Sequence, residues 1–247
     1  MNKLQTLIIT AVLGGLCACQ DGSVSEKTVE DSIVVDSSLH IALVQIAETE
    51  RLFGPEWEKW ADSAGIDAKI DTFWSAMDAD TAFLRGHSHI LITDSVKTEF
   101  LKKEIGKNDS VIILHKDSLT LSLITTKSSR IKNIKSLKDK IIAVTRNSAV
   151  DYTADKITAK AQLPAEALNR PLINDIRIRK QMLMLGQYDG AILPEPFATE
   201  CEDSGANRVF TLKEPILRVV TTRKAKDKFG KEMEIIMKKM TERKLSH

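Results

Sequence analysis

The sequence predicts an α/β protein in which mostly parallel strands are covered by helices. Short apolar runs alternate with amphipathic stretches from Leu39 onward, and this alternation is typical of parallel strands linked by helices. Residues 83–93 and 183–194 also have a similar pattern, because both contain a helix end, a glycine and an apolar strand. The shared pattern indicates two lobes of like architecture, and chance similarity between two βαβ units is the alternative.

The composition is that of an ordinary globular protein. The chain has 247 residues and a net charge of +2, which suits one large domain or two small lobes. Basic residues are interspersed with acidic ones, so we expect a solvated surface of mixed charge and no nucleic-acid partner.

The first 38 residues predict an export signal and an anchor. The apolar run 4–16 is too short to span a membrane as a stable helix. It leads into "LCAC", which resembles the lipobox of bacterial lipoproteins and implies a signal peptide at 1–18 and lipidation of Cys19. A plain secretory signal, cleaved elsewhere, is the alternative. Residues 19–38 are rich in Asp, Glu and Ser and are expected to form a flexible tether.

The first half of the folded region predicts three strand–helix units. Gly54 and Pro55 are expected to break one helix, and Ser75 with Asp78 resembles a capping box at the start of the next. The expected strands are residues 39–45, 67–73 and 87–93, and the expected helices are residues 48–65, 75–86 and 94–106.

The pattern changes after this half and then resumes. Two strand-like runs, 110–116 and 119–126, are expected to have a short turn between them, and a helical turn follows at 134–140. Further strands are expected at 141–145, 170–174, 188–194 and 214–222, and further helices at 147–162, 175–186 and 225–243.

No catalytic or metal-binding pattern stands out. The five histidines lack the spacing of a metal site, and the GxSxG, P-loop and GxGxxG motifs are absent from the sequence. Cys201 has no histidine near it in the sequence and is expected to be a buried, inert thiol. We therefore expect no enzyme activity, no cofactor and no metal.

Polar side chains follow several of the predicted strands. Ligands of open α/β sheets bind beyond the carboxyl ends of the strands, where helix N-termini point. The candidate residues at these junctions are Gln45, Trp74, Ser75, Asp94, Ser95, Arg146, Asn147, Ser148 and Glu195.

Two of these junctions carry more specific chemistry. In "TRNSAVDY", Ser148 as a helix cap leaves backbone N–H groups that favour an anion, and Arg146 adds a positive charge. A capped helix with a solvated arginine is the alternative. In "AILPEPF", Pro194 ends the strand and Pro196 fits the first helical position, which holds Glu195 at the edge of the sheet. Glu195 either faces a cleft or caps the helix.

The second half of the chain resembles a known family. "SLKDKIIAVTRNSAVDYTADKITAKAQL" and "GQYDGAILPEPFAT" are similar to segments of the periplasmic substrate-binding proteins of ABC importers, nearest to the group for sulfonates, nitrate and thiamine-pyrimidine precursors. The likeness covers residues 118–212 well and the first half loosely. It implies a two-lobed clamp of type II, with hinge strands and a ligand between the lobes. Lobe one would be 39–125 and 214–247, and lobe two 126–213.

The resemblance also implies a function and a site. The chain would be a monomeric, lipid-anchored protein of the bacterial cell envelope that delivers a small polar organic nutrient to a permease and an ATPase. Thr93 joins the candidate residues, and the loop of Glu195 would close over the ligand. Asp94 and Glu195 favour a ligand with donors or positive charge, whereas Arg146 favours an anion, so the ligand's charge stays open. The alternatives are a menaquinone-pathway enzyme of the same fold and a lipoprotein that senses a ligand without transport.

Overall fold

The computed structural model describes residues 37–106 and 109–245. The predicted signal peptide at 1–18, the lipidation site Cys19 and the tether up to residue 36 lie outside the described residues. From Ser37 onward the chain forms one compact unit.

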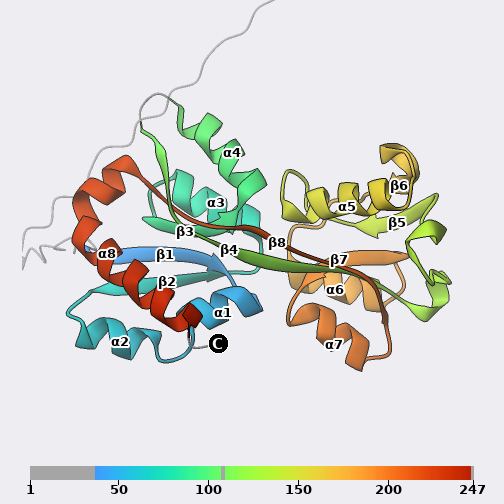
Figure 1. Ribbon diagram of the computed structural model, residues 1–247, viewed down its shortest axis with the longest axis horizontal. Helices are drawn as coiled ribbons and strands as arrows, with labels where there is room; N and C mark the ends of the chain where they lie inside the picture. The colour runs from blue at the N-terminus through green and yellow to red at the C-terminus, as the bar shows by residue number, and fades with distance from the viewer. Residues whose placement is uncertain (1–36, 107–108, 246–247) are drawn as a thin grey trace, which may run out of the picture. The chain divides into compact units, whose positions relative to one another are not determined.

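Eight strands form one sheet, in the order β2-β1-β3-β8-β4-β7-β5-β6 (Figure 1). Apolar side chains on both faces explain why its strands are covered by helices on both sides. All five residues of β3 and all five of β7 are buried. The strands are β1 (Leu39–Val44), β2 (Ala68–Phe73), β3 (Ile90–Asp94), β4 (Val111–Thr125), β5 (Lys140–Ala143), β6 (Leu168–Asn169), β7 (Gly190–Pro194) and β8 (Asn207–Thr222).

The sheet contains the same arrangement twice. β1 lies between β2 and β3 with parallel pairing on both sides, and β5 lies in the same way between β6 and β7. The long antiparallel pair β4 and β8 joins the two sets. We call β1–β3 with α1–α4 and α8 the first half, and β5–β7 with α5–α7 the second half. This repeat explains the shared sequence pattern, since Gly86 and Gly186 both follow a helix in the left-handed conformation, with φ of +75° and +72°.

The helices follow the predicted order. Gly54 ends α1 and a new helix begins two residues after Pro55, as the sequence predicted. Several boundaries are two or three residues shorter than predicted. The helices are α1 (Ala47–Phe53), α2 (Trp57–Ser63), α3 (Ala76–Leu84), α4 (Ser95–Ile105), α5 (Ala149–Lys160), α6 (Ile176–Met184), α7 (Phe197–Asp203) and α8 (Arg223–Leu245), with short 3-10 turns η2 (Lys127–Ser129), η3 (Ile134–Ser136) and η4 (Ala165–Ala167).

Three strand predictions were wrong in detail. The turn predicted between 110–116 and 119–126 is absent, because both runs pair with β8 and a register shift between Asp117 and Leu119 absorbs the irregularity. β8 begins at Asn207, seven residues before its predicted start, since its first part pairs with the second part of β4. The strand predicted at 170–174 is reduced to one bridge between Leu172 and Val144, and β6 precedes it.

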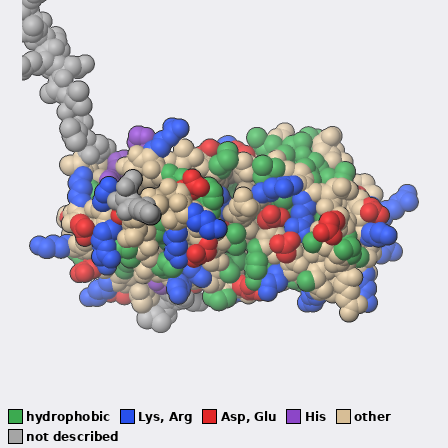
Figure 2. All heavy atoms as spheres, turned by 90° about the horizontal axis from the view of Figure 1, so that it is seen from above, with side chains coloured by type: hydrophobic (Ala, Val, Ile, Leu, Met, Phe, Trp, Pro, Cys, Tyr) green, Lys and Arg blue, Asp and Glu red, His purple; other side chains and the backbone are tan. Residues whose placement is uncertain are grey.

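The face of the molecule seen in Figure 2 has the mixed charge that the sequence predicted. Figure 2 shows lysine and arginine side chains interspersed with aspartate and glutamate across the face in view. Such a face offers no continuous basic stripe of the kind that tracks a nucleic-acid backbone.

Candidate functional site

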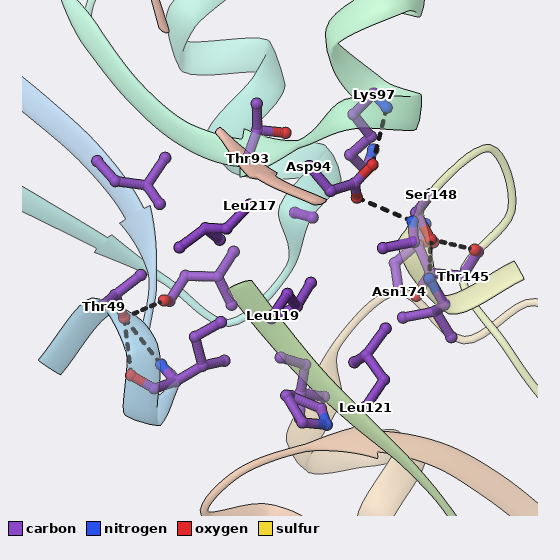
Figure 3. A pocket seen from close by; sticks show the side chains of 18 of the residues that line it. Thr49, Thr93, Asp94, Lys97, Leu119, Leu121, Thr145, Ser148, Asn174 and Leu217 are labelled. Atoms are coloured by element: carbon purple, nitrogen blue, oxygen red, sulfur yellow. Dashed lines mark hydrogen bonds between the residues drawn. The ribbon is translucent and has the colours of Figure 1, made fainter. Parts of the chain in front are cut away.

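A pocket lies between the two halves, against the middle of β4 and β8. Its volume is about 80 Å³, several times the roughly 10–15 Å³ that one water molecule needs. Its lining joins the carboxyl ends of strands with the N-terminal ends of helices from both halves (Figure 3). The wall is mostly apolar, with polar side chains from Thr49, Thr93, Asp94, Lys97, Thr145, Ser148, Asn174 and Arg179.

This pocket differs from the larger hollows at the surface. The hollow of about 580 Å³ beside α3 and α8 is lined by the first half together with Asp109 and Thr222, and the hollow of about 430 Å³ beside α1 and α2 is lined by the first half alone. A site that both halves line is the arrangement in which a movement of the halves couples to binding. The inter-half pocket is therefore the candidate functional site.

Backbone hydrogen bonds hold the two halves together around the pocket. The amide of Ala47 donates to the carbonyl of Glu195 at 2.8 Å, and the amide of Ile176 donates to the carbonyl of Trp74 at 3.0 Å. The Trp74 ring contacts Phe197 edge-on at 6.2 Å between centroids, and the Arg177 guanidinium stacks over it at 4.5 Å. The structure thus has the halves in direct contact.

Asp94 joins the two halves through its side chain. Its Oδ1 accepts from the amides of Val96 and Lys97 at the start of α4, and its Oδ2 accepts from the amide of Ala149 at the start of α5, at 3.0 Å. Figure 3 shows the carboxylate directed toward the loop that carries Ser148. Asp94 therefore fills the helix N-terminus at which the sequence predicted a bound anion.

The buried position of Asp94 predicts a pH effect. Burial raises the pKa of Asp94 above its ordinary value of 3.8, although backbone amides act against it. Because the folded-state pKa is raised, the stability that the group contributes is fully present below pH 3.8 and is lost as the pH rises through the raised value. Over that window we expect the free energy of unfolding to fall more steeply in the wild type than in Asp94→Asn. Denaturant titrations at a series of pH values measure this difference, and equal slopes contradict it.

Ser148 has the role that the sequence predicted for its side chain. It occupies the N-cap of α5, where its Oγ accepts from the amide of Val150 at 3.2 Å and donates to the carbonyl of Thr145. Arg146 and Asn147 precede it on an exposed turn, and Asn147 has φ of +52°. Ser148 borders the pocket, whereas Arg146 and Asn147 do not.

The Glu195 side chain is held by Thr199 of α7 and by Arg208 of β8. Its Oε1 accepts from Arg208, and its Oε2 accepts from the amide of Thr199 at 3.1 Å and from the hydroxyl of Thr199 at 2.8 Å. Burial acts to raise the pKa of Glu195, but the hydrogen bonds from Arg208 and Thr199 outweigh it and lower the pKa. Pro196 is the N-cap of α7, one position before its predicted place, and Pro194 borders the pocket while Glu195 does not. The Glu195 carboxylate thus binds the first turn of α7 through Thr199.

The other candidate residues lie around the pocket or away from it. Thr93 borders it, and Ser95 follows at the start of α4. Trp74 lies in the contact between halves, and Gln45 borders the separate hollow beside α1. The predicted capping box at Ser75 is wrong, because the Ser75 side chain makes no cap hydrogen bond while its backbone bridges to the second half.

The sequence reading missed two charged residues that border the pocket. Lys97 forms a buried ion pair with Asp80. Arg179 is a fully buried residue of α6 whose guanidinium bonds to groups of β5–β7 and their loops. A signal for Arg179 was present, because Ile176, Arg179 and Leu183 have the i, i+3, i+7 spacing of one buried helix face.

The described residues include neither an exposed thiol nor a cluster of metal ligands. Cys201 is buried as predicted, and burial raises the pKa of its thiol to about 11. Within residues 37–106 and 109–245, no His, Cys, Asp and Glu side chains cluster in a way that could hold a metal ion. In the same part of the chain, no helix combines the length and apolar character needed to cross a membrane.

Comparisons with known proteins show the fold. No family model matches the sequence, and no curated protein does. PhnD1 from Prochlorococcus marinus, solved with methylphosphonate, has a TM-score of 0.63 at 10% identity over 82% of this chain and 83% of its own. The alkanesulfonate-binding protein SsuA from Xanthomonas axonopodis pv. citri, bound to MOPS, has a TM-score of 0.68 at 13% identity over 83% and 72%. A Candida albicans gene product with the generic periplasmic binding protein fold has a TM-score of 0.67 at 12% identity over 83% and 70%. This chain therefore has the periplasmic-binding-protein fold that the sequence predicted.

Proposed function

We propose that this chain is the solute-binding protein of an ABC importer and captures a small organic nutrient in the pocket between its halves. The observation that carries the proposal is the pocket itself, which both halves line and which lies where helix N-termini meet strand ends. The similar structures of phosphonate- and sulfonate-binding proteins support it. The chain acts by binding and not by catalysis, as a monomer that passes its ligand to permease and ATPase subunits.

The proposed mechanism is closure of two lobes around the ligand. Lobe one is 39–125 with 214–247 and lobe two is 126–213, so that β4 and β8 cross the boundary and act as hinge strands. The contacts made by Ala47 and Trp74 with the second half break when the lobes open and form again when they close. Ligand trapped in the closed form stabilises it, which is the population shift that such a clamp uses.

A ligand screen tests the binding function. We expect one of a panel of sulfonates, phosphonates, carboxylates, pyrimidines and nitrate to raise the melting temperature. A ligand at a hundred times its dissociation constant adds about 2.7 kcal/mol to the free energy of unfolding. Ala76→Phe, which fills the pocket from its rim, is the control and is expected to abolish the shift. A shift that persists in Ala76→Phe places the ligand elsewhere and contradicts the proposal.

We also propose that the protein is tethered to a membrane through lipid on Cys19, because "LCAC" ends the apolar run at the N-terminus. We expect Cys19→Ala to move the protein from the membrane fraction to the soluble fraction. Two or three acyl chains on the cysteine give stable anchoring, and the variant has no site to carry them. Cys17→Ala is the matched control and is expected to leave the protein in the membrane fraction. Lipid that remains on the Cys19→Ala protein, read by mass spectrometry, overturns the assignment.

A further inference from the structure

The pocket contains a buried positive charge that no carboxylate of the described residues neutralises. Arg179 is 1% exposed and borders the pocket. Its Nε donates to the carbonyl of Ile192 at 3.1 Å, and its Nη1 donates to the Thr145 hydroxyl at 2.7 Å and to the carbonyl of Ile173 at 2.6 Å. All three acceptors are neutral, and Nη2 has no hydrogen-bond partner among residues 37–106 and 109–245.

The other charges around the pocket are satisfied. Lys97 pairs with Asp80, and Asp94 accepts three backbone N–H bonds at the starts of α4 and α5. Asp175, the acid that acts on Arg179 from a distance, makes its own ion pair with Arg177. A buried charge is costly when it is not paired, so Arg179 is the group at this pocket that lacks a counter-charge.

Arg179 carries its charge at neutral pH. Burial lowers the pKa of Arg179 to about 10, and the charge of Asp175 acts in the other direction. The guanidinium therefore stays protonated under physiological conditions, and it keeps a planar set of donors that suits a carboxylate or another oxyacid.

The helix start that would otherwise receive an anion is taken by the protein itself. The amide of Ala149 already donates to Asp94. An anionic ligand would meet the Asp94 carboxylate at that end of the pocket, and like charges repel. The anion is therefore directed away from α5 and toward Arg179.

The remaining lining describes the rest of the ligand. Leu119, Leu121 and Leu217 make an apolar wall from the two long strands. The Thr93 hydroxyl is buried, borders the pocket and has no hydrogen-bond partner among the described residues. A small apolar body with one charged end, and with room for a polar group near Thr93, fits these surroundings.

We propose that Arg179 anchors the anionic end of a small organic monoanion, a carboxylate or an oxyacid with an apolar body, in the pocket between the halves. The proposal rests on the proposed function and names its ligand class. It assigns the recognition of the ligand's charge to Arg179 of α6. The helix start at Ser148 and the exposed Arg146 would not take part.

Calorimetry with probes of matched size tests the proposal. Butyrate and propane-1-sulfonate carry the anion, and propylammonium and 1-propanol carry a positive and a neutral end on the same three-carbon body. We expect the wild type to bind at least one of the two anions more tightly than either other probe. The stronger anion identifies the carboxylate or the oxyacid as the better headgroup.

Variants of α6 complete the test. We expect Arg179→Gln to bind the preferred anion about 30-fold or more weakly, because loss of one partner from a buried charged pair costs about 2 kcal/mol or more. Arg179→Lys is expected to keep part of the affinity. Lys180→Gln removes the next positive charge on the same helix, outside the pocket lining, and is expected to change the affinity less than threefold.

The outcomes separate the two proposals. Stronger binding of propylammonium or 1-propanol overturns the role of Arg179 and leaves the binding function standing. If folded Arg179→Gln binds the preferred anion as tightly as the wild type does, the role of Arg179 is likewise overturned and the binding function stands. Binding of no probe by the wild type overturns the assigned ligand class, and the binding function then stands or falls with the wider ligand screen. If Arg179→Gln does not fold, the comparison of probes on the wild type decides the question by itself.

Discussion

Replacement of Lys97 by methionine is expected to lower the free energy of unfolding by about 3–5 kcal/mol, because it leaves a buried carboxylate without its partner. The Lys97 and Asp80 side chains are only 8% and 6% exposed. Burial raises the pKa of Asp80 despite the nearby ammonium group, and its Oδ1 is buried without a hydrogen-bond partner in the described part of the chain. Urea denaturation at neutral pH measures the loss.

Two control variants show whether the effect belongs to the buried pair. Lys102→Met removes an exposed ion pair with Glu99 on the same helix and is expected to change the free energy of unfolding by at most about 1 kcal/mol. The double variant Asp80→Leu/Lys97→Met replaces both charges with apolar groups and is expected to recover most of the loss. A double variant less stable than Lys97→Met contradicts the argument.

Replacement of Asp94 by alanine is expected to lower the free energy of unfolding by about 2–4 kcal/mol. The change removes the N-cap of α4, which contributes about 1 kcal/mol, and it leaves the buried amide of Ala149 without an acceptor, which costs about 1–3 kcal/mol. The hydrogen bond from Ala149 also joins the halves, so we expect the variant to populate more open forms. Denaturation and small-angle scattering of the same protein measure the two effects.

Asp94→Asn separates the cap from the link between halves. Asparagine caps helices about as well as aspartate, so α4 keeps its start. The amide nitrogen that replaces Oδ2 has no lone pair to accept from Ala149, so the link between the halves is lost. We therefore expect a smaller loss of stability than in Asp94→Ala and a similar degree of opening. Equal stability of the two variants contradicts a separate role for the cap.

Much of the fold could be predicted because the local pattern and the tertiary structure agree. The apolar runs of β1, β3 and β7 and the glycines Gly86 and Gly186 give the strand–helix order directly. The single strand β4 could not be predicted, because the polar residues His115 to Ser118 interrupt its apolar pattern and only the pairing with β8 keeps the chain extended. That pairing joins residues about a hundred positions apart, and no local pattern encodes it.

The site could be predicted less well than the fold. Position after a strand singled out Asp94 and Ser148, and the family resemblance added Thr93; all three border the pocket in the structure. Position after a strand could not tell which side chains the protein satisfies internally, because Arg208, which holds Glu195, lies 13 residues further along the chain on the next strand and no local pattern links the two. Charge alone drew attention to Arg146, whereas burial makes Arg179 the arginine that borders the pocket.

The place of β8 in the sheet has a consequence for biosynthesis. β3 pairs with β8 from Ile90 and Thr221 to Asp94 and Leu217, so the half of the molecule that leaves the ribosome first must wait for the last strand to be made. The second half needs only β4 to β7, which are contiguous in the chain. Segments that are close in the chain meet sooner than distant ones. We therefore expect the second half to finish folding before the first half, although the first half is synthesised earlier.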